Sequence, residues 1–239
     1  MKTHIRRHLV VAFSVLALAL AVLVAAPLTA LGGGGGDGDK NKADSARVRW
    51  DIVQLSPGAS GTIDISRGGK ASAKAESTPG NTANPNRITV TGSGTFRPGK
   101  SGDVTGGGRW WTSGQEVGVH SGTYRVTALV SWLVAPGTVP SPPLNDKITG
   151  HPEDARAGLA VLRVAYSDGS DGILVVSCHL PVGSPDSIFE GITASKGFVD
   201  FWNREGPTGG PSGANENRTQ FHVLRGGDSE QKGDNGGNG

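Results

Sequence analysis

Between positions 47 and 224, apolar residues either alternate with polar ones or form short blocks, separated by clusters of Gly, Pro, Asn and Ser. Alternation with a period of two is typical of strands with one buried face, and such clusters are typical of turns. No stretch shows a helical period. The pattern predicts strands at 48–53, 62–65, 87–96, 124–134, 157–166, 173–180, 188–202 and 219–224.

The clearest local pattern is a hairpin formed by 157–166 and 173–180. Both segments are apolar on both faces, which is typical of strands in the middle of a structure. Two Asp-Gly pairs, at 168–169 and 171–172, lie between them. Because these pairs adopt positive φ readily, they favour a tight turn, and the hairpin is expected to be central.

Two further segments allow more than one arrangement. The alternating alanines at 71, 73 and 75 are expected to pair with 62–65 across the glycines at 68 and 69. Segment 188–202 is either one long strand or two strands with a bend at Gly197. One face of it carries Glu190, Lys196 and Asp200, and we expect that face to be solvated, since ionised side chains are seldom buried. If the face points inward instead, burial among aromatic residues would raise a carboxyl pKa, as general acid catalysis requires.

The strand pattern defines the fold class. About nine to eleven strands with Gly-rich turns predict an all-β domain, a single antiparallel β-barrel or β-sandwich, over residues 47–224. A closed barrel is favoured because closing a long antiparallel sheet removes its edges.

The N-terminal 30 residues have the pattern of an export signal. Lys2, Arg6 and Arg7 precede an apolar run at 9–26, and small residues follow at 28–30. This order is typical of a signal peptide that is removed on secretion. The run is also long enough to span a bilayer, so an uncleaved N-terminal anchor is the alternative.

Glycine-rich segments flank the expected domain. Residues 31–46 contain five consecutive glycines and are expected to be a flexible linker, and 225–239 are expected to be a disordered tail. The chain carries 23 Lys and Arg against 21 Asp and Glu, but three of the basic residues lie in 1–30. A chain without that segment has 20 against 21 and no basic cluster, which excludes the electrostatic surface that nucleic acid requires.

Candidate catalytic chemistry is sparse. A single Cys excludes an intrachain disulfide and a four-Cys zinc site. The histidines of the expected domain, His120, His151, His179 and His222, include no pair with metal-ligand spacing, so no metal or cofactor is expected. Cys178 and His179 are adjacent and would point to opposite faces of a strand, with Cys178 buried among apolar residues. The remaining acid–base candidates are His179 with Glu190 or Asp200.

The adjacent Trp110 and Trp111 are the candidate ligand-binding residues. They follow three glycines, and on a strand they would face opposite ways, so that one is buried while the other is presented. A Trp on a rim offers a flat apolar face with a polar N–H, which suits a glycan or a protein partner.

Three functions remain open from the sequence. The first is a secreted, non-catalytic module that binds a glycan, a small apolar ligand or a protein. The second is a metal-independent isomerase, lyase or hydrolase with an acid–base site at a barrel mouth. The third is a structural protein of the cell envelope, attached to a membrane only through an uncleaved N-terminal segment.

Overall fold

The computed structural model describes residues 46–76, 84–139, 144–210 and 216–224. The expected signal peptide at 1–30, all but the last residue of the linker at 31–46, and the tail at 225–239 lie outside the described residues. Within the described ranges, no helix combines the length and apolar character needed to cross a membrane.

The described chain is almost entirely β-structure, as the alternating pattern predicts, and its two helical elements are single 3-10 turns, η1 (Ala59–Gly61) and η2 (Pro152–Asp154). The strands are β1 (Arg47–Pro57), β2 (Ile63–Arg67), β3 (Ala71–Lys74), β4 (Arg87–Val90), β5 (Ser93–Arg97), β6 (Lys100–Val104), β7 (Gly107–Ser113), β8 (His120–Ala135), β9 (Leu144–Asp146), β10 (Ala155–Tyr166), β11 (Asp171–Cys178), β12 (Gly191–Lys196), β13 (Val199–Phe201), β14 (Asn203–Arg204) and β15 (Arg218–Leu224).

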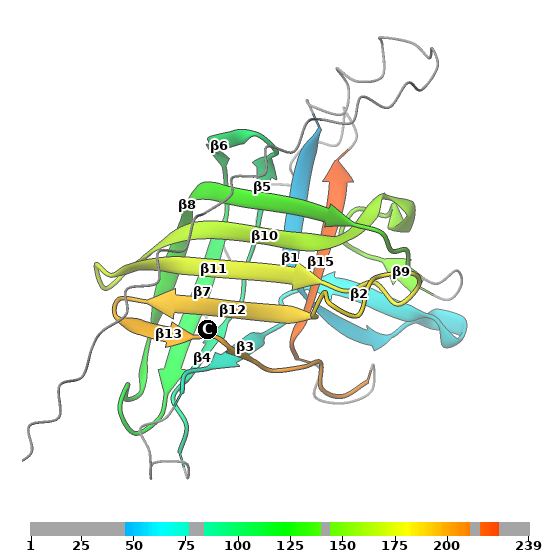
Figure 1. Cartoon of the computed structure of the whole chain (residues 1–239). Coiled ribbons are helices and arrows are strands. Elements are labelled where there is room, and N and C mark those ends of the chain that lie inside the picture. Colours follow the sequence, from blue (N-terminus) through cyan, green and yellow to red (C-terminus); the bar gives the residue numbers. More distant parts are fainter. Residues whose placement is uncertain (1–45, 77–83, 140–143, 211–215, 225–239) are drawn as a thin grey trace, which may run out of the picture. The chain divides into compact units, whose positions relative to one another are not determined.

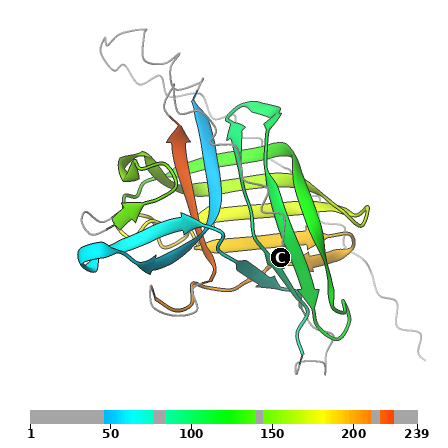
Figure 2. The same cartoon turned by 180° about the vertical axis from the view of Figure 1, so that it is seen from behind.

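The sheet closes into an antiparallel barrel, which confirms the predicted fold class. A continuous ring of pairing runs from β10 through β8, β7, β5, β1 and β15 back to β10. In Figure 1, β8, β10, β11, β12 and β13 lie side by side across the near face. Figure 2 shows the other face, where β1 and β15 run next to each other in a different direction. Strand β8 belongs to both faces, because it pairs with β7 and then with β10.

The strand number in the described residues is fifteen, larger than the predicted nine to eleven, because several segments are interrupted. The predicted strand at 87–96 is two strands, β4 and β5, which pair with different partners. The predicted pairing of the alanine segment with 62–65 is wrong. Strand β3 pairs with β4 and β14, whereas β2 pairs with β1 and β9.

The central hairpin and the bend at Gly197 are both confirmed. Strands β10 and β11 pair along their length, from Gly158 opposite Cys178 to Ala165 opposite Asp171. Segment 188–202 forms β12 and β13, joined by a turn at 197–198. Asp200 is exposed as expected.

The expectation that the whole Glu190 face of segment 188–202 is solvated is wrong for β12. Ile192 and Ala194, which share that face, are fully buried. The turn changes which residues face inward, because Ala194 pairs with Phe201 and both lie in the core. Directly paired residues of a hairpin lie on the same face of the sheet. The inward-facing residues are therefore even-numbered in β12 and odd-numbered in β13.

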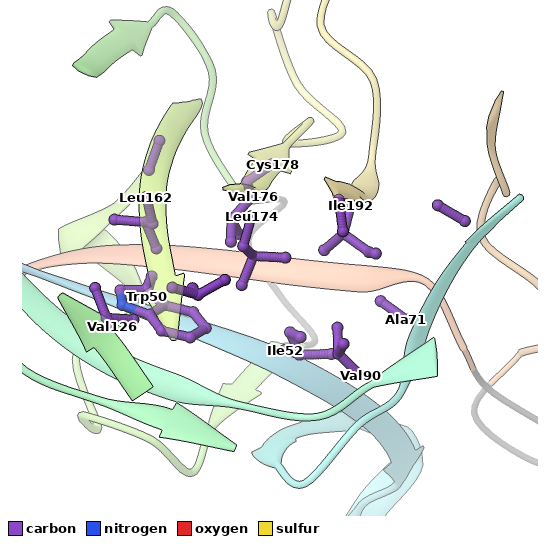
Figure 3. Close-up of a cluster of buried hydrophobic side chains, with 14 of the residues drawn as sticks. Trp50, Ile52, Ala71, Val90, Val126, Leu162, Leu174, Val176, Cys178 and Ile192 are labelled. Carbon is purple, nitrogen blue, oxygen red and sulfur yellow. The ribbon is translucent and has the colours of Figure 1, made fainter. Parts of the chain in front are cut away.

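The interior of the barrel is filled by side chains from both faces. In Figure 3, Leu162, Leu174 and Ile192 point toward Trp50 and Ile52 on β1. Aromatic contacts extend this core, since the ring of Trp132 lies 4.5 Å from that of Phe221 and 5.3 Å from that of Phe96. The buried position predicted for Cys178 is also confirmed.

We expect Gly94→Ala to destabilise the barrel. Gly94 lies directly opposite Trp50, and a Cβ there would be 2.2 Å from the carbonyl oxygen of Thr105 and 2.8 Å from Trp50 Nε1. Such overpacking costs about 1–3 kcal/mol of unfolding free energy. Gly102→Ala is the control, because a Cβ at that exposed position meets nothing within 4 Å. Equal melting temperatures for the two variants would contradict the close packing of Gly94 against Trp50.

Candidate functional site

A cleft lies between the β12–β13 hairpin and the connection from β7 to β8, and we call it the β12–β13 cleft. It has a larger chamber of about 440 Å³ and a smaller one of about 280 Å³. Glu116, Val117 and Val199 line both chambers, so the two are adjacent. The other residues of the larger chamber are Ala75, Glu76, Asn86, Phe198, Asp200, Trp202 and Asn203. The other residues of the smaller chamber are Trp110, Thr112, His120, Asp168, Lys196 and Phe201.

The β12–β13 turn places aromatic side chains on the rim. Lys196 pairs with Val199, which leaves Gly197 and Phe198 as a two-residue turn, and Gly197 supplies the positive φ of 57°. A glycine at the first position is typical of a tight turn of this kind. Phe198 is fully exposed and Trp202 is 50% exposed, although large apolar side chains are usually buried.

The opposite wall is held by the buried amide of Asn86. Its Oδ1 accepts hydrogen bonds from the backbone N–H groups of Glu116 and Val117, at 3.1 and 3.2 Å. Its Nδ2 donates to Glu116 Oε2 at 2.6 Å. One side chain thus fixes the turn after β7 and positions the Glu116 carboxylate where the two chambers meet.

The smaller chamber has an aromatic floor with a charged pair above it. Trp110 is 2% exposed and donates its Nε1–H to the carbonyl oxygen of Thr123 at 3.1 Å. The Lys196 ammonium lies 4.3 Å from the centre of the Trp110 ring and forms an ion pair with Asp168. The hydrogen bond from Lys196 lowers the pKa of Asp168 to about 2, so that carboxylate is ionised at neutral pH.

One polar group in the smaller chamber is unsatisfied. Thr112 is buried, and its hydroxyl has no hydrogen-bond partner among the described residues. Buried hydroxyl groups in folded proteins almost always have one.

The larger chamber is acidic. Glu76, Glu116 and Asp200 line it, and among the described residues no Lys, Arg or His belongs to its lining. The remaining polar lining residues are Asn86 and Asn203. The chamber therefore combines convergent hydrogen-bond acceptors with exposed aromatic faces.

The structure separates the two adjacent tryptophans, as strand geometry predicts. Trp110 packs in the core and forms the floor of the smaller chamber. Trp111 is half-buried on the outer face, where Lys70 and Arg109 lie 5.8 and 5.6 Å from its ring centre. Of the predicted ligand-binding pair, only Trp110 contributes to the cleft.

The acid–base candidates are not brought together. Asp200 lines the cleft and pairs with Ser195 on β12. Glu190 directly precedes Gly191, where β12 begins. Gly191 lies four strand residues, or about 13 Å, from Ser195. The Glu190 carboxylate instead accepts the backbone N–H groups of His179 and Thr219, at 2.6 and 2.5 Å. These contacts tie the ends of β11, β12 and β15 together, which is a structural role.

A network of buried ionisable side chains lies on the outer face of β1 and β15. The fully buried His222 places its Nε2 3.1 Å from Asp146 Oδ2, and Arg49 forms a hydrogen-bonded ion pair with Asp51. Burial raises the pKa of Asp51 to about 6, although Arg49 opposes the shift. Although burial also opposes ionisation of Asp146, hydrogen bonds from His222 and Thr149 hold its pKa below the usual range. This network joins β9 to the barrel.

Another cluster has metal-ligand residue types. His151, Glu153 and Asp154 place three potential ligand atoms within 4.8 Å of one another at η2. The His151 Nδ1 atom lies 3.3 Å from Glu153 Oε1, so a local pair accounts for part of the cluster.

Sequence reasoning missed most of the cleft. Phe198, Trp202 and Glu116 carry no motif, and Asn86 is separated in the chain from the turn that it organises. The one available signal was a large aromatic residue directly after Gly197, in a predicted bend. Comparisons with protein-family models, curated proteins and solved structures find no match to this chain.

We expect the stability of the protein to fall as pH rises toward 8, and Glu190→Gln to flatten that decline. Burial raises the pKa of Glu190 from 4.5 to about 8, despite the hydrogen bonds from Thr219 and His179. The folded state therefore binds this proton more tightly than the unfolded state. The resulting stability is complete below about pH 4.5 and is lost as pH approaches 8.

The measurement is the urea midpoint from pH 5 to pH 8. The slope above pH 6 is diagnostic, because Asp51, with its pKa of about 6, contributes mainly below that value. The exposed Asp186 provides a control variant, Asp186→Asn, which should keep the wild-type slope. An unchanged slope in Glu190→Gln would contradict the assignment.

Proposed function

We propose that the protein is a secreted, non-catalytic module that binds a glycan in the β12–β13 cleft. The observation that carries the proposal is the exposure of Phe198 and Trp202 beside an open chamber of about 440 Å³ lined by carboxylates and amides. Secretion is part of the proposal and rests on the signal-like pattern of residues 1–30.

A sugar matches both kinds of surface in the cleft. Its ring presents flat C–H faces that pack on aromatic side chains, and its hydroxyl groups donate hydrogen bonds to carboxylates and amides at the edges. Small-molecule sites generally combine apolar surface with a few placed polar groups in this way. The chamber volume lies within the range of such sites, 300–1,000 Å³ in order of magnitude.

The other ligand classes fit less well. A small apolar ligand would need an empty apolar interior, whereas the barrel core is filled by Trp50, Phe96, Leu162 and their neighbours. A protein partner would bury more surface than these two rim residues provide, and the exposed apolar side chains of β8, Val130, Leu133 and Val134, do not line the cleft.

A glycoside hydrolase is the second candidate function. Glu116 and Asp200 both line the cleft, and a pair of carboxylates is the group that most glycosidases use. Product analysis of the incubated oligosaccharide distinguishes the two functions. Recovery of the intact ligand is expected. Release of shorter sugars would show that the protein is a hydrolase and would contradict the non-catalytic function.

We expect Trp202→Ala to weaken glycan binding by about tenfold, the usual loss when a central aromatic contact of about 1–2 kcal/mol is removed. Calorimetric titration of the full chain with β-1,4-linked tetrasaccharides of glucose, N-acetylglucosamine and glucosamine provides the measurement. Trp111→Ala is the matched control, because Trp111 lies on the outer face away from the cleft. Failure of all three sugars to bind, or equal losses in both variants, would refute the proposal.

A further inference from the structure

The sheet surface formed by β8, β10 and β11 on the outside of the barrel is apolar. We infer that this surface is where two copies of the chain associate face to face as a symmetric dimer. It consists of six apolar side chains, and we call it the outer hairpin face: Val130, Leu133, Leu159, Val161, Ile173 and Val175. None of the six lines the β12–β13 cleft, so the inference does not rest on glycan binding.

Strand pairing gathers these side chains on one side of the sheet. Leu133 lies directly opposite Leu159, and Val161 lies directly opposite Val175. Directly paired residues share one face of a sheet. Along β10 they alternate with core residues such as the fully buried Leu162, so the outer hairpin face points away from the barrel interior.

Within the described residues, the outer hairpin face has no covering layer. Val130 and Leu133 are 53% and 64% exposed, and the other four side chains are half-buried. None of the six belongs to the core cluster or packs against it. In Figure 1 the face is turned toward the viewer, and no labelled strand crosses it. A sheet with one side in water normally carries polar residues there, so an apolar outer side indicates a partner.

The size of the outer hairpin face fits a weak, reversible dimer. From Leu159 to Ala165 it extends about 20 Å along β10, and three strands make it about 15 Å wide, which gives about 300 Å² of flat area. Apolar patches of this size on a monomer often mark interaction sites. The area is below the roughly 800 Å² per partner of a standard interface, so we expect a dissociation constant on the order of 10 µM.

The charges at one end of the face favour a second copy as the partner. Arg163 on β10 pairs with Ile173 on β11, and Asp171 lies two residues earlier on β11. Both charged side chains are exposed, and no ion pair within the described ranges engages either of them. The face therefore presents a cation on one strand and an anion on the neighbouring strand at the same end.

A two-fold axis makes this arrangement self-complementary. The axis runs parallel to β10 and β11, between them and above the sheet, and exchanges the two strands without changing the position along them. Arg163 then faces β11 of the other copy, next to Asp171 of the partner subunit. Val161 faces Val175 of the partner subunit, because these two residues are paired. The apolar contact removes surface from water, and the two symmetric charge pairs fix the orientation.

The terminal segments of the same chain are poorer candidates for covering the face. Residues 225–239 contain no aliphatic or aromatic side chain, and residues 31–46 contain only Leu31, Ala43 and Ala46. The strongly apolar run at 9–26 belongs to the segment that secretion would remove. A second copy instead supplies an equal apolar area together with the matching charges.

Sedimentation velocity of the full chain tests the inference, over concentrations from about 1 to about 300 µM. The dimer should grow with concentration and reach half of the material near the expected dissociation constant. Val161→Arg should weaken it at least about tenfold, because it puts a charge into the centre of the apolar contact. Val119→Arg is the matched control, since Val119 is 86% exposed and lies outside the face. The melting temperature of each variant shows that it is folded.

Charge exchange at the exposed end of the face tests the symmetry without altering an apolar residue. Arg163→Asp and Asp171→Arg should each weaken the dimer by about fivefold, because each sets like charges against one another in both symmetric contacts. The double variant should recover the wild-type dissociation constant, since the pair is then simply reversed. Unchanged association in both single variants would overturn the inferred contact.

The remaining outcomes are also decisive. A chain that stays monomeric at every concentration would overturn the inference. A dimer of wild-type strength in Val161→Arg would arise from another surface, such as the apolar run at 9–26, and would overturn it as well. Binding of the monomer to phosphatidylcholine vesicles, lost in Val161→Arg, would replace the second copy with a lipid surface.

Discussion

The pairing of β15 between β1 and β10 is the interaction on which the rest of the structure depends. Within the described residues, this strand completes the ring, and it places Phe221 in the core opposite Trp50 on β1. Its other face carries His222, which joins β9 to the barrel. Its Thr219 holds the Glu190 carboxylate at the start of β12. One strand therefore links both faces of the sheet with the segments that cover them.

The cleft forms where the sheet extends beyond the closed ring of strands. Strands β12 and β13 continue the near face beyond the ring, and their turn leaves Phe198 without neighbours in the core. The buried Asn86 fixes the opposite wall through backbone contacts. Because both walls are held by a rigid scaffold, the acidic and aromatic groups converge without requiring a long loop.

Short-range patterns predicted the fold better than they predicted the site. The Asp-Gly turn and the doubly apolar strands around it identified the central hairpin, since its pairing is local. The alanine segment was assigned the wrong partner because β3 reaches β4 across residues 77–83 and β14 from much later in the chain. Strand parity separated Trp110 from Trp111 correctly.

Strand parity failed across the β12–β13 turn, because direct pairing of Ala194 with Phe201 changes which positions face inward. The cleft residues could not be grouped from the sequence. Glu76, Glu116 and Asp200 are far apart in the chain, and only the pairing order of the sheet brings them to one chamber.

The position of β15 in the chain has a consequence for how the protein forms. One ring partner of this strand is made long before it, since β1 begins at residue 47 and β15 ends at 224. Until β15 has been synthesised, β1 and β10 lack the partner that joins them, and Phe221 is missing from the core. Contacts this distant in sequence form late and slowly. A chain still on the ribosome would thus stay incompletely folded until its last strand is available.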